Sequence, residues 1–230
     1  MQLQSITSAG HISSFRVRQS IVTSYRDMQD ANSTTSMLIE ARKDPPAIQT
    51  TLSTDGGPPI ITLIVPNGLW QRAGDGWTRS DIGDVPEGWA LRAYREIGDM
   101  SLAAPVSAQA VIDAGSERGS ETFGGKSLTR YSAGTELMLR LSQEAGEAQN
   151  RGEHPAGWAA APLDGSFTNR FEADLWVDSE TGFVIRERTV VEYTEERLHG
   201  QDLGTGPAIF TTTREFFDLN AEIGLESPTG

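Results

Sequence analysis

One short stretch has the residue types of a phosphate-binding loop. Gly124-Gly125-Lys126-Ser127 matches the end of that motif, in which backbone amides and a lysine hold phosphate at the start of a helix. The position of the leading glycine is occupied by Ser120, however, and the residues that follow, 128–131, are typical of a strand. We therefore interpret the two glycines as the turn of a β-hairpin.

A second candidate site is acidic. The carboxylates of Asp178, Glu192, Glu195 and Glu196 are of the type that holds Ca²⁺ or forms the acid and base of a glycosidase. Charged residues are also ordinary on the outer face of a solvated antiparallel sheet. We favour the solvated sheet face as the interpretation of this acidic run.

Other catalytic and metal-binding patterns are absent from the sequence. His11, His154 and His199 are scattered and show no spacing for zinc ligands. There is no Gly-x-Ser-x-Gly motif to hold a serine nucleophile, and no cysteine to supply a thiolate or a disulfide. We therefore expect no catalytic residue, no cofactor and no metal.

Composition indicates a folded domain that avoids nucleic acid. The 19 basic and 32 acidic residues give a net charge of −13, which repels phosphate backbones and anionic head groups. The hydrophobic fraction is 37% with a mean hydropathy of −0.37, and the apolar residues lie in patterned runs. No run is long enough to cross a bilayer.

The elements around these residues are predicted to be strands. Alternation of apolar and polar residues predicts early strands at 15–25, 36–42, 48–53 and 60–65, joined by short links as in an antiparallel meander. Trp70 and Trp77 flank a glycine-rich turn that could line the mouth of a pocket. Later strands are predicted at 116–123, 128–131 and 209–219, with an alanine-rich segment at 102–114 and an amphipathic helix at 135–149.

Residues 171–193 predict the clearest hairpin. Phe171, Leu175 and Val177 point to one side of the first strand, and the return strand continues this apolar side with Ile185 and Val191. Leu175-Trp176-Val177-Asp178, an acidic turn and Gly182-Phe183-Val184-Ile185-Arg186 resemble the late hairpin of the LolA-like lipoprotein superfamily, that of LolA, LppX, LprG and the N-terminal domain of RseB. The order of predicted elements along nearly the whole chain is similar to that superfamily.

The resemblance implies both a fold and a function. The fold is α+β: a curved antiparallel sheet forms an incomplete β-barrel around covering helices, here as one domain over residues 1–230. The implied function is non-catalytic binding of a lipid or of lipoprotein acyl chains, in the periplasm or at the cell surface. A signal peptide and a lipidated anchoring segment are expected ahead of Met1. The alternatives are an envelope sensor of the same fold that binds other envelope proteins, and an enzyme.

The expected lipid site is the concave face of the sheet. Residues that alternate with polar neighbours are predicted to share this face, with Arg16, Arg18, Glu40, Arg186 and Arg188 on the other. The residues expected to contact lipid are Phe15, Val17, Met37, Ile39, Leu63, Val65, Trp70, Leu175, Val177 and Ile185.

Overall fold

The computed structural model describes residues 3, 11–66, 68–80, 90, 93–94, 111–113, 115–137, 168–193, 197–198, 201–202, 207–226 and 228. Within these ranges, short helical stretches occur at residues 93–94, 111–113 and 135–137, and a 3-10 turn, η1, at Gln29–Ala31. The strands are β1 (Ser14–Tyr25), β2 (Ser33–Lys43), β3 (Pro46–Thr54), β4 (Ile60–Val65), β5 (Gly68–Ala73), β6 (Trp77–Arg79), β7 (Ser116–Phe123), β8 (Lys126–Gly134), β9 (Thr168–Asp178), β10 (Val184–Tyr193), β11 (Arg197–Leu198), β12 (Gln201–Asp202) and β13 (Ala208–Phe217).

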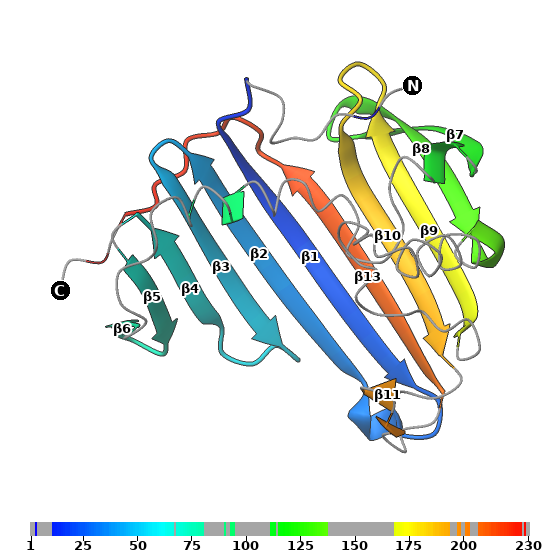
Figure 1. Ribbon diagram of the computed structural model, residues 1–230, viewed down its shortest axis with the longest axis horizontal. Coiled ribbons are helices and arrows are strands. Elements are labelled where there is room, and N and C mark those ends of the chain that lie inside the picture. The colour runs from blue at the N-terminus through cyan, green and yellow to red at the C-terminus, as the bar shows by residue number, and fades with distance from the viewer. Residues whose placement is uncertain are drawn as a thin grey trace, which may run out of the picture. The chain divides into compact units, whose positions relative to one another are not determined.

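An 11-stranded antiparallel sheet dominates the structure. Its strand order is β6-β5-β4-β3-β2-β1-β13-β10-β9-β8-β7, and β11 pairs separately with β12 (Figure 1). Because β6 and β7 stand at opposite ends of this order, the sheet is not closed. The predicted unclosed antiparallel sheet is therefore confirmed. Two compact units are formed: unit 1 is Met1–Leu3, Ile21–Ser33 and Ser101–Thr213, and unit 2 is Gln4–Ser20, Thr34–Met100 and Arg214–Gly230.

The predicted strands are present, and several extend beyond the predicted ends. The strand expected at 48–53 begins at Pro46, which lies directly opposite Lys43 in β2. The turn between β2 and β3 is therefore only Asp44 and Pro45, whereas the sequence predicts that both prolines separate the strands. A proline is tolerated as the first residue of a strand because its missing N–H is not needed there.

Several expectations concern residues outside the described ranges. These are most of the amphipathic helix at 135–149, the alanine-rich residues 102–110, Glu195, Glu196, His154 and His199. In the part of the chain that is described, no helix has the length and hydropathy needed to span a bilayer.

The core of unit 1 lies on one face of the β9–β10 hairpin. Phe171, Leu175 and Val177 of β9 are fully or almost fully buried there, as the alternating pattern predicts. The short helical stretches at 111–113 and 135–137 contribute Val111 and Leu137 to the same cluster. These two side chains therefore cover part of this face within unit 1.

Asp178 organises the turn of this hairpin. Its carboxylate accepts hydrogen bonds from the backbone N–H groups of Glu180 at 2.9 Å and Thr181 at 3.3 Å. The ammonium group of Lys126 donates to it at 3.1 Å. Burial by itself would raise the pKa of the Asp178 carboxyl, but these hydrogen bonds and the Lys126 charge outweigh burial and lower that pKa.

We predict that Asp178→Asn lowers the free energy of unfolding near neutral pH. The substitution keeps one acceptor oxygen but loses the attraction to Lys126. Because the folded-state pKa of Asp178 is depressed, its stabilisation is present above the ordinary value of 3.8 and disappears as the pH falls through the lowered pKa. Urea unfolding of both proteins across acidic pH should therefore show converging stabilities. A difference that stays constant at low pH would contradict this account.

Candidate functional site: an aliphatic sheet face and a charged pocket

On one face of unit 2, three adjoining rows of residues across β2–β5 carry no charged side chain, and Lys43 at the end of β2 lies beyond them. Directly opposite residues of antiparallel strands share a face, so the register defines rows that cross the strands. One row is Met37, Leu52, Ile60 and Ala73. The rows beside it are formed by Ile39, Thr50, Thr62 and Gln71, and by Ala41, Ile48, Ile64 and Leu69. We call these residues the aliphatic face.

The first row of the aliphatic face is open to solvent. Leu52 is 36% exposed and Ile60 is 49% exposed, and Met37 beside them is half-buried. Farther along the same strands, Ile39 and Ile48 are buried. Since residues opposite each other in a sheet have Cβ atoms about 5 Å apart, the exposed side chains form one continuous apolar patch.

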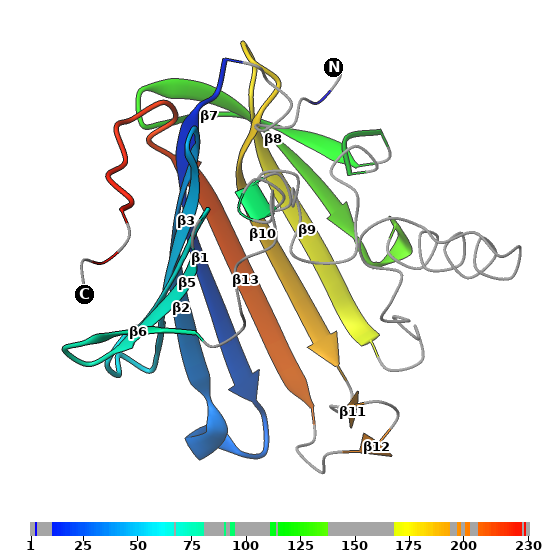
Figure 2. The ribbon, with the colours of Figure 1, turned by 60° about the vertical axis from the view of Figure 1, so that its left-hand side comes forward.

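The other face of the same strands is covered by the C-terminal segment of the chain. Ile223 and Leu225 pack on Ala47, Leu63 and Val65, with Trp70 and Trp77 at the margin of the cluster. Arg42 fixes this segment by donating hydrogen bonds to the carbonyl oxygens of Ile223 at 3.1 Å and Leu225 at 2.9 Å. Figure 2 shows the red C-terminal segment on one side of this part of the sheet. We call this side the tail-covered face.

The prediction of one shared lipid-facing surface is wrong for Leu63, Val65 and Trp70. Leu63 lies opposite both Gln49 and Trp70, on the tail-covered face, whereas Met37 and Ile39 lie on the aliphatic face. The reason is the composition of β4, Ile-Ile-Thr-Leu-Ile-Val, which is apolar on both sides. A period of two cannot tell the faces of such a strand apart.

Phe15 and Val17 are fully buried in unit 2. The neighbouring Arg16 donates a hydrogen bond to Glu40 at 2.8 Å, which places Arg16 on the tail-covered face with Glu40. Alternation then puts Phe15 and Val17 on the side of the aliphatic face, as predicted. Phe15 packs there against Tyr94, with ring centroids 5.0 Å apart, and burial raises the pKa of Tyr94 to about 12.

Ile185 does not join Leu175 and Val177 as the sequence predicts. A register shift between Val184 and Arg186 places Val184 opposite Val177, and Val184 belongs to the buried cluster of unit 1. Ile185 is buried but lies at the shift and outside that cluster. One extra residue in a strand reverses the faces of all residues after it.

The register shift also creates an ion-pair site on the opposite face of unit 1. Beyond the shift, Arg186 lies opposite Trp176 and Arg188 lies opposite Asp174, so both arginines are on the face away from the core, as predicted. Without the shift, Asp174 would face Glu187. The extra residue therefore replaces a repulsive cross-strand pair by an attractive one.

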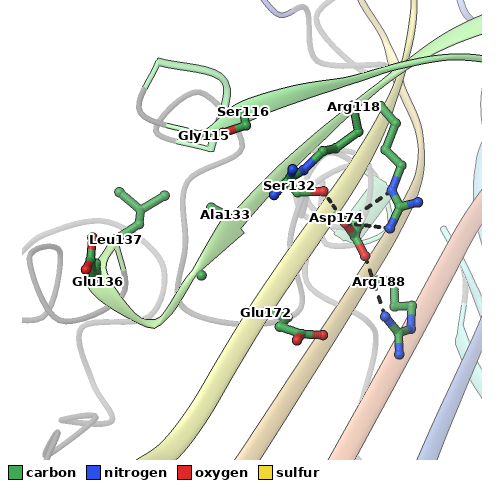
Figure 3. A pocket seen from close by; sticks show the side chains of 12 residues that line it. Gly115, Ser116, Arg118, Ser132, Ala133, Glu136, Leu137, Glu172, Asp174 and Arg188 are labelled. Carbon is green, nitrogen blue, oxygen red and sulfur yellow. Dashed lines mark hydrogen bonds and ion pairs between the residues drawn. The ribbon is translucent and has the colours of Figure 1, made fainter.

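A pocket of about 550 Å³ lies at this site, between β7, β8, β9 and β10 of unit 1 (Figure 3). Asp174, which is 6% exposed, accepts hydrogen bonds from Arg130 Nε at 3.2 Å, from Arg130 Nη2 at 3.0 Å and from the Ser132 hydroxyl. Arg188 Nη1 approaches its second oxygen to 3.5 Å. The pocket is thus charged and differs from the apolar void that the lipid-carrier interpretation leads one to expect.

An aromatic ring holds the arginines of this face in place. The guanidinium carbons of Arg130 and Arg186 lie 5.1 Å and 4.9 Å from the centroid of the Trp176 ring. Trp176 donates its indole N–H to Glu121 at 3.0 Å and is almost fully buried. Cation–π contacts of this kind fix the planes of the guanidinium groups. Trp176 is therefore structural.

The sequence alone did not predict that five pocket residues form a group: Arg118, Arg130, Ser132, Asp174 and Arg188. The available signal was the alternation of charged with apolar residues in the hairpin, which puts Asp174 and Arg188 on polar strand faces. The register shift that joins them has no signature in the residues around Ile185. Their convergence could therefore not be read from the alternation alone.

The motifs that the sequence analysis set aside have structural roles. Gly124 and Gly125 have φ angles of +55° and +79° and connect Phe123 to its partner Lys126, so the predicted hairpin turn is confirmed. Asp178 lies at the turn end of the β9–β10 hairpin and Glu192 at the other end, which excludes a site made by both. Within the described residues no His, Asp and Glu side chains group as metal ligands.

We predict that Asp174→Asn destabilises the protein by about 1–3 kcal/mol, because a carboxylate that holds charged donors is replaced by a neutral amide. Glu172→Gln is the matched control on the same strand. Among the described residues Glu172 pairs with Arg170, at 2.6 Å, and these side chains are 39% and 53% exposed, so its loss should cost less than about 0.5 kcal/mol. Thermal unfolding of both variants measures the difference. Equal losses would contradict the central role of Asp174.

No family model matches the sequence, and no curated protein matches it. Solved structures do match over most of the chain. Mycobacterium tuberculosis lipoprotein LppX is 11% identical, with a TM-score of 0.44, over 96% of this chain and 94% of LppX. LprF of Mycobacterium bovis is 10% identical, with a TM-score of 0.45, over 98% of this chain and 94% of LprF. A LolA superfamily protein of Nitrosomonas europaea is 10% identical, with a TM-score of 0.31, over 96% of this chain and 91% of that protein.

Proposed function

We propose that the protein binds acyl chains of lipids, without catalysis, and that the aliphatic face of unit 2 is the contact surface. The observation that carries this proposal is the exposed row of Met37, Leu52 and Ile60, which belongs to the three uncharged rows across β2–β5. In a chain of net charge −13, this surface is set apart by its lack of charge. Exposed, contiguous apolar patches of this kind mark binding surfaces.

The composition of β4 explains why the aliphatic face is suited to an apolar ligand. A strand that is apolar on both sides is typical of a sheet that is covered on both sides. The chain's own residues Ile223 and Leu225 cover one side. On the other side, Leu52 and Ile60 remain in contact with water. An apolar ligand would complete the cover that the chain provides on one side only.

The chemistry of the face favours an acyl chain. Its exposed members are aliphatic, and the neighbouring row contributes Thr50 and Thr62, which are small and uncharged. Each methylene group that leaves water for such a surface contributes about 0.8 kcal/mol, without any need for a hydrogen-bonding partner. We therefore expect broad selectivity among lipids and no turnover. The resemblance of the late hairpin to extracytoplasmic lipoproteins supports placing this function outside the cytoplasm.

We predict that Leu52→Gln and Ile60→Gln each weaken the binding of a fluorescent acyl probe about tenfold, since each removes several apolar contacts. Both side chains are exposed, so the free energy of unfolding should change by less than about 0.5 kcal/mol. Ile209→Gln is the control, because Ile209 is 36% exposed, as is Leu52, and lies on β13 outside the aliphatic face. Its probe affinity should equal that of the wild type.

Fluorescence titration of the purified, delipidated protein makes these measurements. Native mass spectrometry before delipidation should show co-purified lipid on the wild type and less on the variants. Saturable uptake that is equally weakened by all three substitutions would point to general hydrophobic adsorption. Absence of saturable uptake by the wild type would refute the proposed function.

A further inference from the structure

We propose that the pocket of unit 1 is an oxyanion-binding site, and that its ligand is a phosphate group. The donors are the guanidinium groups of Arg118, Arg130 and Arg188, which line the pocket together with Ser132. This site lies in β7–β10 and is independent of acyl binding on the aliphatic face of unit 2.

A register shift brings Arg118 into the pocket. Glu117 lies opposite Tyr131 and Gly119 lies opposite Arg130, so Arg118 is the extra residue of the edge strand β7. Gly119 has a φ of +104°, a conformation that favours glycine and makes the bulge possible. Bulges of this type redirect a side chain. Figure 3 shows Arg118 reaching from β7 toward Ser132.

Arg118 has a charge that the described protein does not neutralise. Its residue is exposed, and among the described residues its side chain makes no hydrogen bond or ion pair. Glu172, which also lines the pocket, is engaged by Arg170 through bonds of 2.9 Å and 2.6 Å. Glu136, in the short helical stretch, also lines the pocket and is exposed. Arg118 thus keeps its donors for a ligand.

Asp174 prepares the other two arginines. It is buried and fixes Arg130 by two hydrogen bonds, while Arg188 approaches it with one nitrogen at 3.5 Å. A single carboxylate therefore orients two guanidinium groups. Glu121 lies 3.8 Å from Arg130 Nη1 and gives Arg130 a second carboxylate, so the less neutralised charge of the two is that of Arg188. A guanidinium group has five N–H donors, so both arginines retain donors beyond those directed at Asp174. These side chains are already ordered in the free protein, so ligand binding costs less side-chain conformational entropy.

The number of arginines favours phosphate over a carboxylate. A carboxylate presents two oxygens in one plane and is satisfied by one guanidinium fork, whereas a phosphate group presents oxygens in several directions. Three arginines from β7, β8 and β10 approach from different strands. This arrangement suits a tetrahedral anion that accepts from more than one guanidinium group.

An apolar wall adjoins the arginines. Leu137 lines the pocket and also belongs to the buried cluster of unit 1, and Ala133 lines it and packs against that cluster. A phosphate group attached to a lipid would find charged donors on one side and apolar atoms on the other. The phosphate can therefore come from a lipid head group or from a soluble phosphate compound, and these two sources are distinguishable by experiment.

The test uses the full chain and four probes: inorganic phosphate, glycerol phosphate, a lysophosphatidic acid below its micelle concentration, and the monoacylglycerol with the same acyl chain. Amide NMR shifts of Ser116, Gly119 and Ser132 report on the pocket, and those of Leu52 and Ile60 report separately on the aliphatic face. We expect the phosphate-bearing probes to shift the pocket resonances, with an affinity that falls as salt is added.

Arg118→Gln should weaken this binding about tenfold or more, because it removes charge-assisted hydrogen bonds. Arg26→Gln is the control for charge: Arg26 is also in unit 1, its side chain is 66% exposed, and it pairs with Glu192 at 3.3 Å away from the pocket residues. Its effect on phosphate affinity should be negligible. Both variants should unfold at nearly the wild-type temperature, since both side chains are exposed.

The four probes separate the outcomes. Tighter binding of lysophosphatidic acid than of glycerol phosphate supports a lipid head group, and equal binding supports a soluble phosphate compound. The proposal is overturned if no phosphate-bearing probe shifts the pocket resonances, or if Arg118→Gln and Arg26→Gln weaken binding equally. Monoacylglycerol that shifts neither set of resonances would refute acyl binding while leaving the phosphate site in place.

Discussion

The structure depends on covering β4 on both sides. Five of the six residues in Ile-Ile-Thr-Leu-Ile-Val are apolar, so neither side of this strand can face water without cost. The chain covers one side with its own C-terminal segment, which Arg42 holds by two backbone carbonyls. The other side carries the charge-free rows of β2–β5. One side of β4 thus contributes to the stability of unit 2, and the other side forms a surface suited to an external partner.

Unit 1 follows a different principle, in which a single extra residue sets the chemistry. The shift at Ile185 directs Val184 into the core and pairs Arg188 with Asp174. A second shift in β7, at Arg118, adds a further guanidinium group to the same face. Strand irregularities at these two places convert an ordinary solvated sheet face into a pocket with converging charges.

The sequence predicted the elements well and the faces unevenly. Strands were predictable where apolar and polar residues alternate, as in β9, because burial of one face imposes the period. The face on which Leu63 and Val65 lie was not predictable, because β4 has no polar side that would show which side faces the solvent. The grouping of Asp174 with Arg130 and Arg188 was not predictable either, because it depends on pairing between strands and on a one-residue shift. Local patterns determine which segments are strands, whereas long-range register determines which side chains meet.

The bulge in β7 has a second consequence, for association between molecules. β7 is the last strand of the sheet and is exposed along nearly all of its length, so its free edge could pair with a strand of another chain. The extra residue at Arg118 interrupts the regular spacing of its backbone donors and acceptors, and Glu117 and Glu121 add charges at either side. Continuous edge-to-edge pairing is therefore disfavoured. The residue that supplies a ligand contact in our proposal also helps to keep the protein from polymerising through its sheet.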